Sequence, residues 1–291
     1  MTEQALNTPT ASSTQPYRPS LRLRLERRGL NPTLLAGLIM LAIIILAALA
    51  APLLTPYNPI EQSLNDSFLP PFSPGHILGT DNFGRDIWSR IIYGARLDLQ
   101  IGFISVLFPF FFGIFIGIMA GYLGGKTDTA VMRVVDVLMA FPFLILVIAI
   151  MAILGPGLTN LYIAVAVVGW IPYSRLVRGQ TLATRNLEYV QAAKATGCDT
   201  PRILGRHILP NVTGPALIYV FTGMVLAILT GATLSFLGLG PQPPTPEWGA
   251  MIAEGRQYLL QAPWMATIPG LALLVVGVAF SLIADGLAER R

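Results

Sequence analysis

The chain has 291 residues, of which 54% are hydrophobic and 12% charged, a net charge of +4 and a mean hydropathy of +0.64. Soluble domains carry about 25% charged residues, so this composition excludes a soluble globular protein. Its apolar residues form long runs without strict alternation, which favours membrane helices over barrel strands. We therefore predict an all-α polytopic membrane protein. A single cysteine, Cys198, excludes an internal disulfide.

Residues 1–30 begin with a stretch rich in Ser, Thr, Pro and Gln and end with four arginines, Arg22, Arg24, Arg27 and Arg28. The first part predicts a disordered tail, because it offers little apolar surface to bury. The arginines predict a basic cytoplasmic anchor that can lie on anionic lipid. The following apolar run is long enough to span a bilayer and lacks a convincing cleavage site, so we expect no signal peptide.

Residues 31–291 are predicted to form one transmembrane domain with about six helices. The expected spans are about 34–54, 101–121, 130–154, 161–177, 214–236 and 265–284. In the second span, Gly113, Gly117 and Gly121 recur every fourth residue, which predicts close packing against a neighbouring helix.

Before the second span, an amphipathic helix is expected at the membrane interface. Thr80 or Asp81 can cap it, and its apolar face would carry Trp88, Ile91, Ile92 and Ala95. Arg85, Asp86 and Arg90 lie away from that face. A helix that bears Trp next to a span is typical of the interface.

The third and fourth spans hold the candidates for a path or gate. Arg133 and Asp136 are one turn apart near a membrane edge, which predicts an ion pair, and Asp136 is also a candidate for closing the inner mouth. Gly169, Trp170 and Pro172 interrupt the fourth span. Irregular backbone at membrane depth is tolerated next to protein or a water-filled cavity, so these three residues are candidates for lining a path.

The polar stretch 188–210 has the pattern of helix, glycine turn and helix. Glu188 to Thr196 favours a helix, and Gly197 stands where a left-handed residue ends one. Asp199 or Thr200 can cap a second short helix that starts at Pro201. Pro210 is expected to separate this helix from the fifth span. Between spans five and six, four prolines predict an extended segment, Pro241, Pro243, Pro244 and Pro246.

The basic residues predict the orientation. With the N-terminus inside, fifteen of the 19 Lys and Arg residues lie in cytoplasmic segments, and the other four, Arg85, Arg90, Arg96 and Arg256, lie in external ones. The positive-inside rule then predicts that both termini and the stretch 188–210 are cytoplasmic.

Three stretches resemble one family. Gln191-Ala192-Ala193, Gly197 and Leu209-Pro210 resemble the cytoplasmic "EAA" loop of ABC importer permeases, although the family usually has Glu where this chain has Gln191. The block from Leu78 to Arg96 and the segment from Phe236 to Arg256 resemble the C-type subunit of the dipeptide, oligopeptide and nickel permease group.

The resemblance implies a transmembrane subunit of an ATP-driven importer, for di- or oligopeptides, in a bacterial inner membrane. It implies a second, B-type permease subunit in a heterodimer, two ATP-binding subunits, one of which receives the 188–210 loop, and an extracytoplasmic substrate-binding protein. The chain itself would form half of the path, with no enzymatic activity, cofactor or metal of its own and no nucleic-acid partner. ATP would be hydrolysed on the partner subunits.

Alternatives remain open at this point. A secondary transporter or channel would carry ionisable residues within its spans, whereas the charges here lie at span edges. Nickel or glutathione as substrate stays within the same family. An intramembrane enzyme is disfavoured, because the two histidines, His76 and His207, are expected on opposite sides of the membrane. Residues 120–127 match a relaxed nucleotide-binding pattern, but they follow a membrane helix and not a strand.

Overall fold

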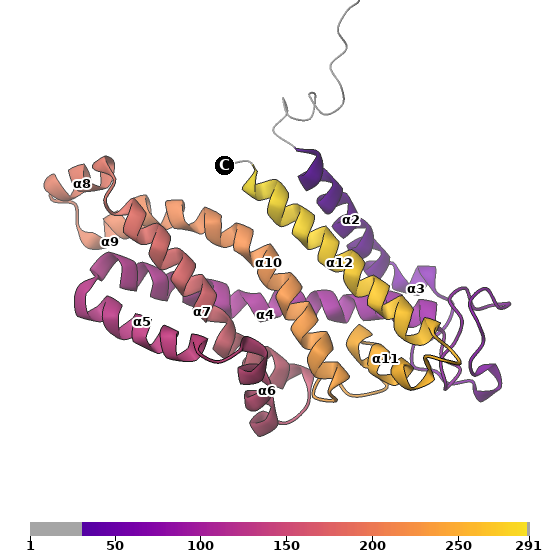
Figure 1. The fold of residues 1–291 in the computed structure, drawn as a ribbon. Helices are drawn as coiled ribbons and strands as arrows, with labels where there is room; N and C mark the ends of the chain where they lie inside the picture. Colours follow the sequence, from indigo (N-terminus) through magenta and orange to yellow (C-terminus); the bar gives the residue numbers. More distant parts are fainter. Residues whose placement is uncertain (1–30, 290–291) are drawn as a thin grey trace, which may run out of the picture.

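A computed structural model describes residues 31–289, and the predicted disordered basic tail, residues 1–30, lies outside them. Within the described part the chain is helical, with no strand and two isolated bridges. The predicted all-α class is confirmed. Figure 1 shows long helices packed side by side, with short helices and loops at the two ends of the molecule.

Five helices are long and apolar enough to cross a membrane, and the bent pair α5–α6 brings the number to six among the described residues. This confirms the expectation of about six spans. The long helices are α2 Pro32–Leu49, α4 Ile87–Leu123, α7 Leu158–Thr184, α10 Leu209–Phe236 and α12 Trp264–Ala288. The bent pair is α5 Gly125–Met139 and α6 Phe143–Leu154, and the short helices are α3 Ala51–Leu54, α8 Glu188–Ala195, α9 Thr200–Ile203 and α11 Trp248–Gly255.

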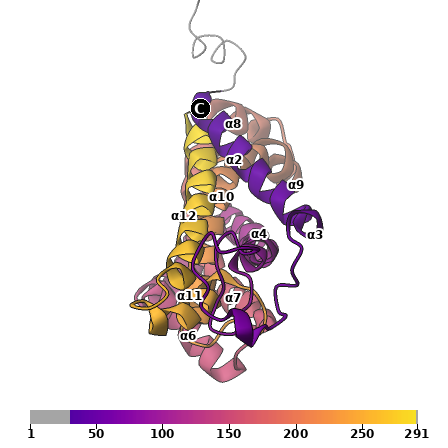
Figure 2. The same ribbon diagram turned by 90° about the vertical axis from the view of Figure 1, so that its right-hand side faces the viewer.

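Helices α2 and α12 lie side by side. The Asn31 side chain donates to the Gly286 carbonyl at 3.0 Å, and Gly37 leaves no room for a side chain beside Ile283. Figures 1 and 2 both show α8 and the C-terminal end of α12 on one side of the molecule, with α11 toward the other. The two membrane faces are therefore built from different parts of the sequence.

The glycine stripe on α4 is the contact surface for α7, as predicted. A Cβ on Gly117 would lie 2.7 Å from the Ser174 carbonyl oxygen, and one on Gly121 would lie 2.8 Å from the Thr181 Cβ. Any side chain at these positions would force the two helices apart. Small residues allow such close backbone approach, which is a main source of helix association in lipid.

The interfacial helix and the second span are one helix, α4, whereas two separate elements were expected. Its cap is Asp86 and not Thr80 or Asp81: the Asp86 carboxylate accepts from the Ser89 N–H at 2.7 Å. The helix is continuous because no proline separates its interfacial part from the apolar span. Pro109, one helix turn beyond Ser105, lies inside the helix.

The third span was expected to be continuous and the fourth to be broken, and both predictions were wrong. The third span is broken, with 84° between α5 and α6, because Phe141 precedes Pro142 and the residue before proline is disfavoured in a helix. The fourth span, expected to be broken, is the continuous helix α7 with Pro172 inside it. Gly169 leaves room for the ring of Pro109 from α4, so the two helices pack closely at this point.

The segment between α10 and α12 is only partly extended. Its prolines lie outside helices, as expected, but the second half forms α11. Glu247 caps this helix by accepting from the N–H groups of Gly249 at 2.9 Å and Ala250 at 2.7 Å.

Candidate coupling and translocation site

Helix α8 projects from the end of the molecule that carries the C-terminal end of α12 (Figure 1). Gln191 and Ala192 are exposed and Ala193 is half-buried, whereas Val190 is fully buried. Val190 packs into a cluster with residues of α4, α7 and the chain that follows, including Ile118, Val177 and Ile203. Val190 thus anchors α8, with Ala193 packed on the same cluster, and the exposed Gln191 and Ala192 are available to bind another molecule.

The turn after α8 has the geometry expected of a glycine-terminated helix. Gly197 has φ +81°, and its N–H donates to the Lys194 carbonyl at 3.0 Å. The Cys198 N–H donates to the Ala193 carbonyl at 3.0 Å. These two bonds are the Schellman pattern, which satisfies carbonyls that the helix end leaves free. The left-handed conformation predicted for Gly197 is confirmed.

The second arm of the loop differs from its prediction. Asp199 is the N-cap of α9, without a side-chain cap bond, and a π-helical segment, Leu204–Ile208, leads directly into α10. Leu209 and Pro210 are exposed in the first turn of α10, where proline is tolerated, so Pro210 does not separate the arm from the span. The second arm and the fifth span therefore form one continuous helical segment, Thr200–Phe236, which can transmit a displacement of the loop to the span.

Two ion pairs join α5 to α7 near the base of the loop. Asp128 pairs with Arg178, whose Nη2 lies 2.6 Å from Oδ2. Asp136 pairs with Arg175 at 2.8 Å, and not with Arg133 as predicted. Arg133 and Asp136 are exposed residues of the same helix, one turn apart. The residue that donates to the Asp136 carboxylate is Arg175, which lies on α7. Asp136 therefore ties two helices together.

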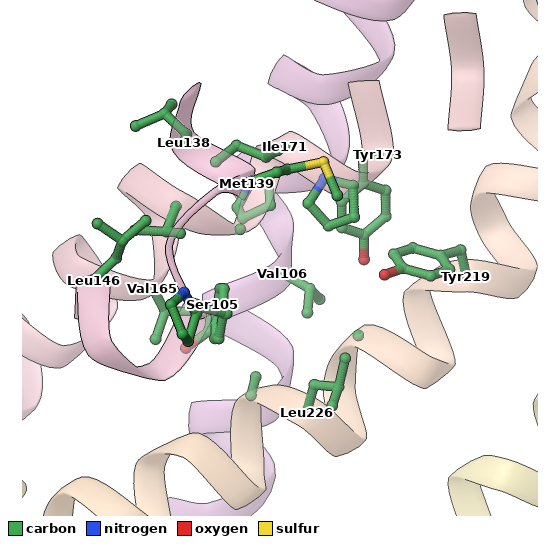
Figure 3. A pocket seen from close by; sticks show the side chains of 18 of the residues that line it. Ser105, Val106, Leu138, Met139, Leu146, Val165, Ile171, Tyr173, Tyr219 and Leu226 are labelled. Carbon is green, nitrogen blue, oxygen red and sulfur yellow. The ribbon is translucent and has the colours of Figure 1, made fainter. Parts of the chain in front are cut away.

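A pocket of about 410 Å³ lies between α4, α7, α10 and the bend that separates α5 from α6 (Figure 3). Gly169 and Pro172 line it. Trp170 does not: it packs edge-to-face on Phe112 of α4, with ring centroids 5.3 Å apart. Asp136 also lies outside the lining, one turn before Met139, which does line the pocket. The structure thus brings two of the four path candidates into one pocket.

The pocket is apolar apart from three hydroxyl groups, and none of its described lining residues is charged. Ser105 and Tyr173 are buried, and their hydroxyls have no hydrogen-bond partner among the described residues. The Tyr219 ring packs edge-on against Tyr173, with centroids 4.9 Å apart, and Figure 3 shows their hydroxyls close together. The pocket can therefore receive an apolar group and offer hydrogen bonds to an uncharged polar one.

Several of these lining residues were missed in the sequence. The bend carried a signal in Phe141-Pro142, which indicates a probable helix boundary. Ser105 and Tyr219 carried none, because a single hydroxyl in an apolar run is compatible with any face of a helix. Their grouping depends on how four helices pack.

The stretch that matches a relaxed nucleotide-binding pattern lies at the junction of two helices. Residues 120–123 end α4, Gly124 is its C-cap and Lys126 is in the first turn of α5. A phosphate-binding loop needs a preceding strand, and none precedes this junction in the described chain. Within the described residues, no group of three or more His, Cys, Asp or Glu could hold a metal ion.

Comparison with known proteins assigns the class that this fold and loop define, a multi-pass membrane permease. Residues 113–291 match the family "Binding-protein-dependent transport system inner membrane component", and residues 30–71 match the "N-terminal TM domain of oligopeptide transport permease C". A dipeptide transport system permease protein of Alkalihalophilus pseudofirmus is 44% identical over 89% of this chain and 85% of its own length. A glutathione transport system permease protein of Pectobacterium atrosepticum is 42% identical over 87% and 84%.

Among solved structures, the inward-facing MetNI methionine ABC transporter aligns with a TM-score of 0.57 at 18% identity, over 70% of this chain and 97% of that one. This likeness shows a shared fold. The chain belongs to the family of binding-protein-dependent inner membrane components, the permease subunits of ABC importers. The relatives are named as permeases, and the chain is accordingly a transport subunit.

Proposed function

We propose that this chain is one of two different permease subunits of an importer for di- or oligopeptides in a bacterial inner membrane. It forms half of the translocation path and works with an extracytoplasmic binding protein. Two separate subunits bind and hydrolyse ATP, and the chain itself holds no cofactor. Peptide as the substrate is supported by the relative named as a dipeptide permease, and glutathione, itself a small peptide, is the substrate in the name of another.

The observation that carries the coupling role is the exposure of α8 beside a continuous second arm. Gln191 and Ala192 offer a free surface, Gly197 fixes the turn, and the arm that follows runs without a break into α10. A push on α8 by a nucleotide-binding subunit would therefore move a helix that lines the pocket. In this proposal ATP binding opens the path by tilting α10 and α7.

The test is uptake into proteoliposomes that contain the full complex and its binding protein. We expect ATP-dependent uptake of dipeptides or tripeptides that the binding protein holds in calorimetry. Uptake without ATP would identify a secondary transporter. A binding protein that takes Ni²⁺ and no peptide would retain the family but exclude the peptide substrate.

The orientation has its own test at Cys198, a half-buried residue of the loop. With the loop and both termini in the cytoplasm, a membrane-impermeant maleimide should label inverted vesicles prepared without the ATPase subunits. Right-side-out vesicles should remain unlabelled. Labelling from the outside would reverse the topology and remove the coupling role.

A further inference from the structure

Two acidic residues are buried against each other where α11 packs on α4. Asp98 is 1% exposed and Glu247 is fully buried. Asp98 accepts a hydrogen bond from the N–H of Trp248, the residue directly after Glu247, which brings the two carboxyl groups close together. Two buried carboxylates in contact repel each other and both lose hydration, so such a pair is unstable unless a cation or a proton joins it.

The hydrogen bonds around the pair are unequal. Glu247 accepts two good bonds from backbone N–H groups as the cap of α11. Asp98 accepts one long bond, from the Trp248 N–H at 3.3 Å, and its Oδ1 is buried without a donor among the described residues. Hydrogen bonds from N–H groups favour an ionised carboxylate. Glu247 is thus equipped to keep its charge, and Asp98 is left with an unsatisfied oxygen.

No described cation neutralises either group. At the other end of α11, Glu254 pairs with Arg85 at 2.6 Å and with Arg90 at 3.5 Å. The other charged groups of the packed elements are committed elsewhere: Asp81 bonds Arg85, Arg96 donates to carbonyls of α2, and Arg256 lies over the Phe236 ring. The acidic residues at the two ends of α11 therefore differ in the charge beside them. Glu254 lies beside two arginines, whereas the cap residue Glu247 lies beside another carboxyl group.

Helix α4 packs closely on the segment that leads into α11, one turn before Asp98. A Cβ on Gly94 would lie 2.8 Å from the Pro246 carbonyl oxygen and 2.9 Å from the Trp248 Nε1. The Trp248 indole donates to the Ile91 carbonyl at 3.1 Å and is 2% exposed. Hard cations need six or more oxygen ligands, and here both oxygens of Glu247 already accept N–H bonds. A proton needs only the two carboxyl groups.

We propose that Asp98 and Glu247 form a proton-binding site, in which Asp98 is protonated at neutral pH and donates its O–H to the Glu247 carboxylate. The shared proton holds Glu247, the cap residue of α11, against Asp98 of α4. Its loss to the external water at alkaline pH leaves two buried negative charges in contact, which loosens α11. The site is independent of which substrate the protein transports.

The protonated carboxyl can be observed directly by infrared spectroscopy of the complex in lipid at neutral pH. We expect the C=O band of a protonated carboxyl, shifted when the protein is grown on isotope-labelled aspartate. The band should be absent in Asp98→Asn, whose amide still donates to Glu247, and retained in the control Asp136→Asn, which alters an exposed ion pair. Identical spectra for the native protein and Asp98→Asn would overturn the proposal.

Hydrogen exchange of the α11 amides provides the second readout. After correction for intrinsic exchange, protection in the native protein should fall at least several-fold over the pH range in which the band disappears. Asp98→Asn should show no such fall. If Asp98→Asn fails to assemble, Asp98→Ser supplies a smaller hydroxyl donor for both measurements. Disappearance of the band at constant pH on adding Na⁺ or Ca²⁺ would assign the site to a cation and contradict the proton.

Discussion

The two ends of the molecule differ in how they place their charged residues: one end buries its ion pairs and the other exposes them. Where α11 packs on α4, Arg85 and Arg90 are 2% and 1% exposed at the side chain and share Asp81 and Glu254. At the loop end, Arg202 and Asp199 lie 3.9 Å apart and are 67% and 69% exposed. The first end is completed by the chain itself, whereas the second offers its surface to another molecule.

This difference follows from the physics of ion pairs. A buried pair must be satisfied on all sides, because an uncompensated buried charge costs several kcal/mol. An exposed pair contributes about 0–1 kcal/mol and can change partners at little cost. The end with α11 is therefore a rigid layer, and the loop with α8 is suited to binding and releasing a partner through a cycle.

Removing an arginine from the buried cluster should have the largest effect. Arg85→Ala leaves the Asp81 and Glu254 carboxylates without their 2.6 Å partner. We expect a loss of about 3–5 kcal/mol in the free energy of unfolding. Thermal unfolding of the purified protein in detergent measures it, with Arg202→Ala as the matched control, expected within about 1 kcal/mol of the native protein. Equal losses in the two variants would contradict the comparison.

The packing of α4 against α7, between the two ends, should show the next largest effect. Gly117→Ala would place a methyl 2.7 Å from the Ser174 carbonyl, whereas Gly179→Ala, on the partner helix α7, has nothing within 4 Å. Overpacking predicts a cost of about 1–3 kcal/mol for the first and none for the second. Alanine also favours a helix over glycine, so Gly179→Ala should be slightly stabilising. Equal unfolding temperatures for the two variants would show that the stripe is not under steric constraint.

At the exposed end a strained turn should affect coupling and leave assembly of the complex intact. Gly197→Val puts a β-branched residue at φ +81°, which costs about 1–3 kcal/mol locally. The second arm would then be reoriented relative to α8. We expect normal assembly, with substrate uptake and substrate-stimulated ATP hydrolysis lost together in proteoliposomes.

Gly205→Val is the matched control for the turn, because Gly205 lies in the same loop with open space around it and no left-handed backbone. It should retain both activities. A Gly197→Val complex that assembles and transports at the native rate would show that the loop is only a connector.

The fold class and the number of spans could be predicted because they depend on composition and on runs of apolar residues. Gly197 and the α4 stripe could be predicted because a glycine at a helix end, or repeated every fourth residue, has one main physical use. The paths of α5–α6 and α7 could not. Pro142 stands at the break between α5 and α6, whereas Pro172 lies inside the continuous helix α7, and a proline in an apolar run is compatible with either outcome.

The arrangement of charges was also beyond local patterns. Asp136 has Arg133 one turn away, yet its partner is Arg175, 39 residues further along the chain. Asp98 is a single polar residue shortly before an apolar run, and its position beside Glu247 depends on where α11 packs. Such pairings are set by tertiary structure, and sequence spacing along one helix favours only the nearest partner.

The smallest effect is expected at the residue where this chain departs from its family. Gln191 is exposed on α8, and its amide donates to the Arg185 carbonyl at 2.9 Å. Gln191→Glu removes this donor, because a carboxylate only accepts, at a cost of about 0.5–1.5 kcal/mol that solvent reduces at an exposed site. The added negative charge near the start of α8 offsets part of this loss through the helix dipole. We therefore expect uptake and ATP hydrolysis within about twofold of the native complex, measured beside Ala192→Glu, which puts the same charge on the neighbouring exposed position. If Gln191→Glu abolishes coupling while Ala192→Glu does not, the amide itself contacts the partner subunit, and α8 is less adaptable than the comparison with the buried end implies.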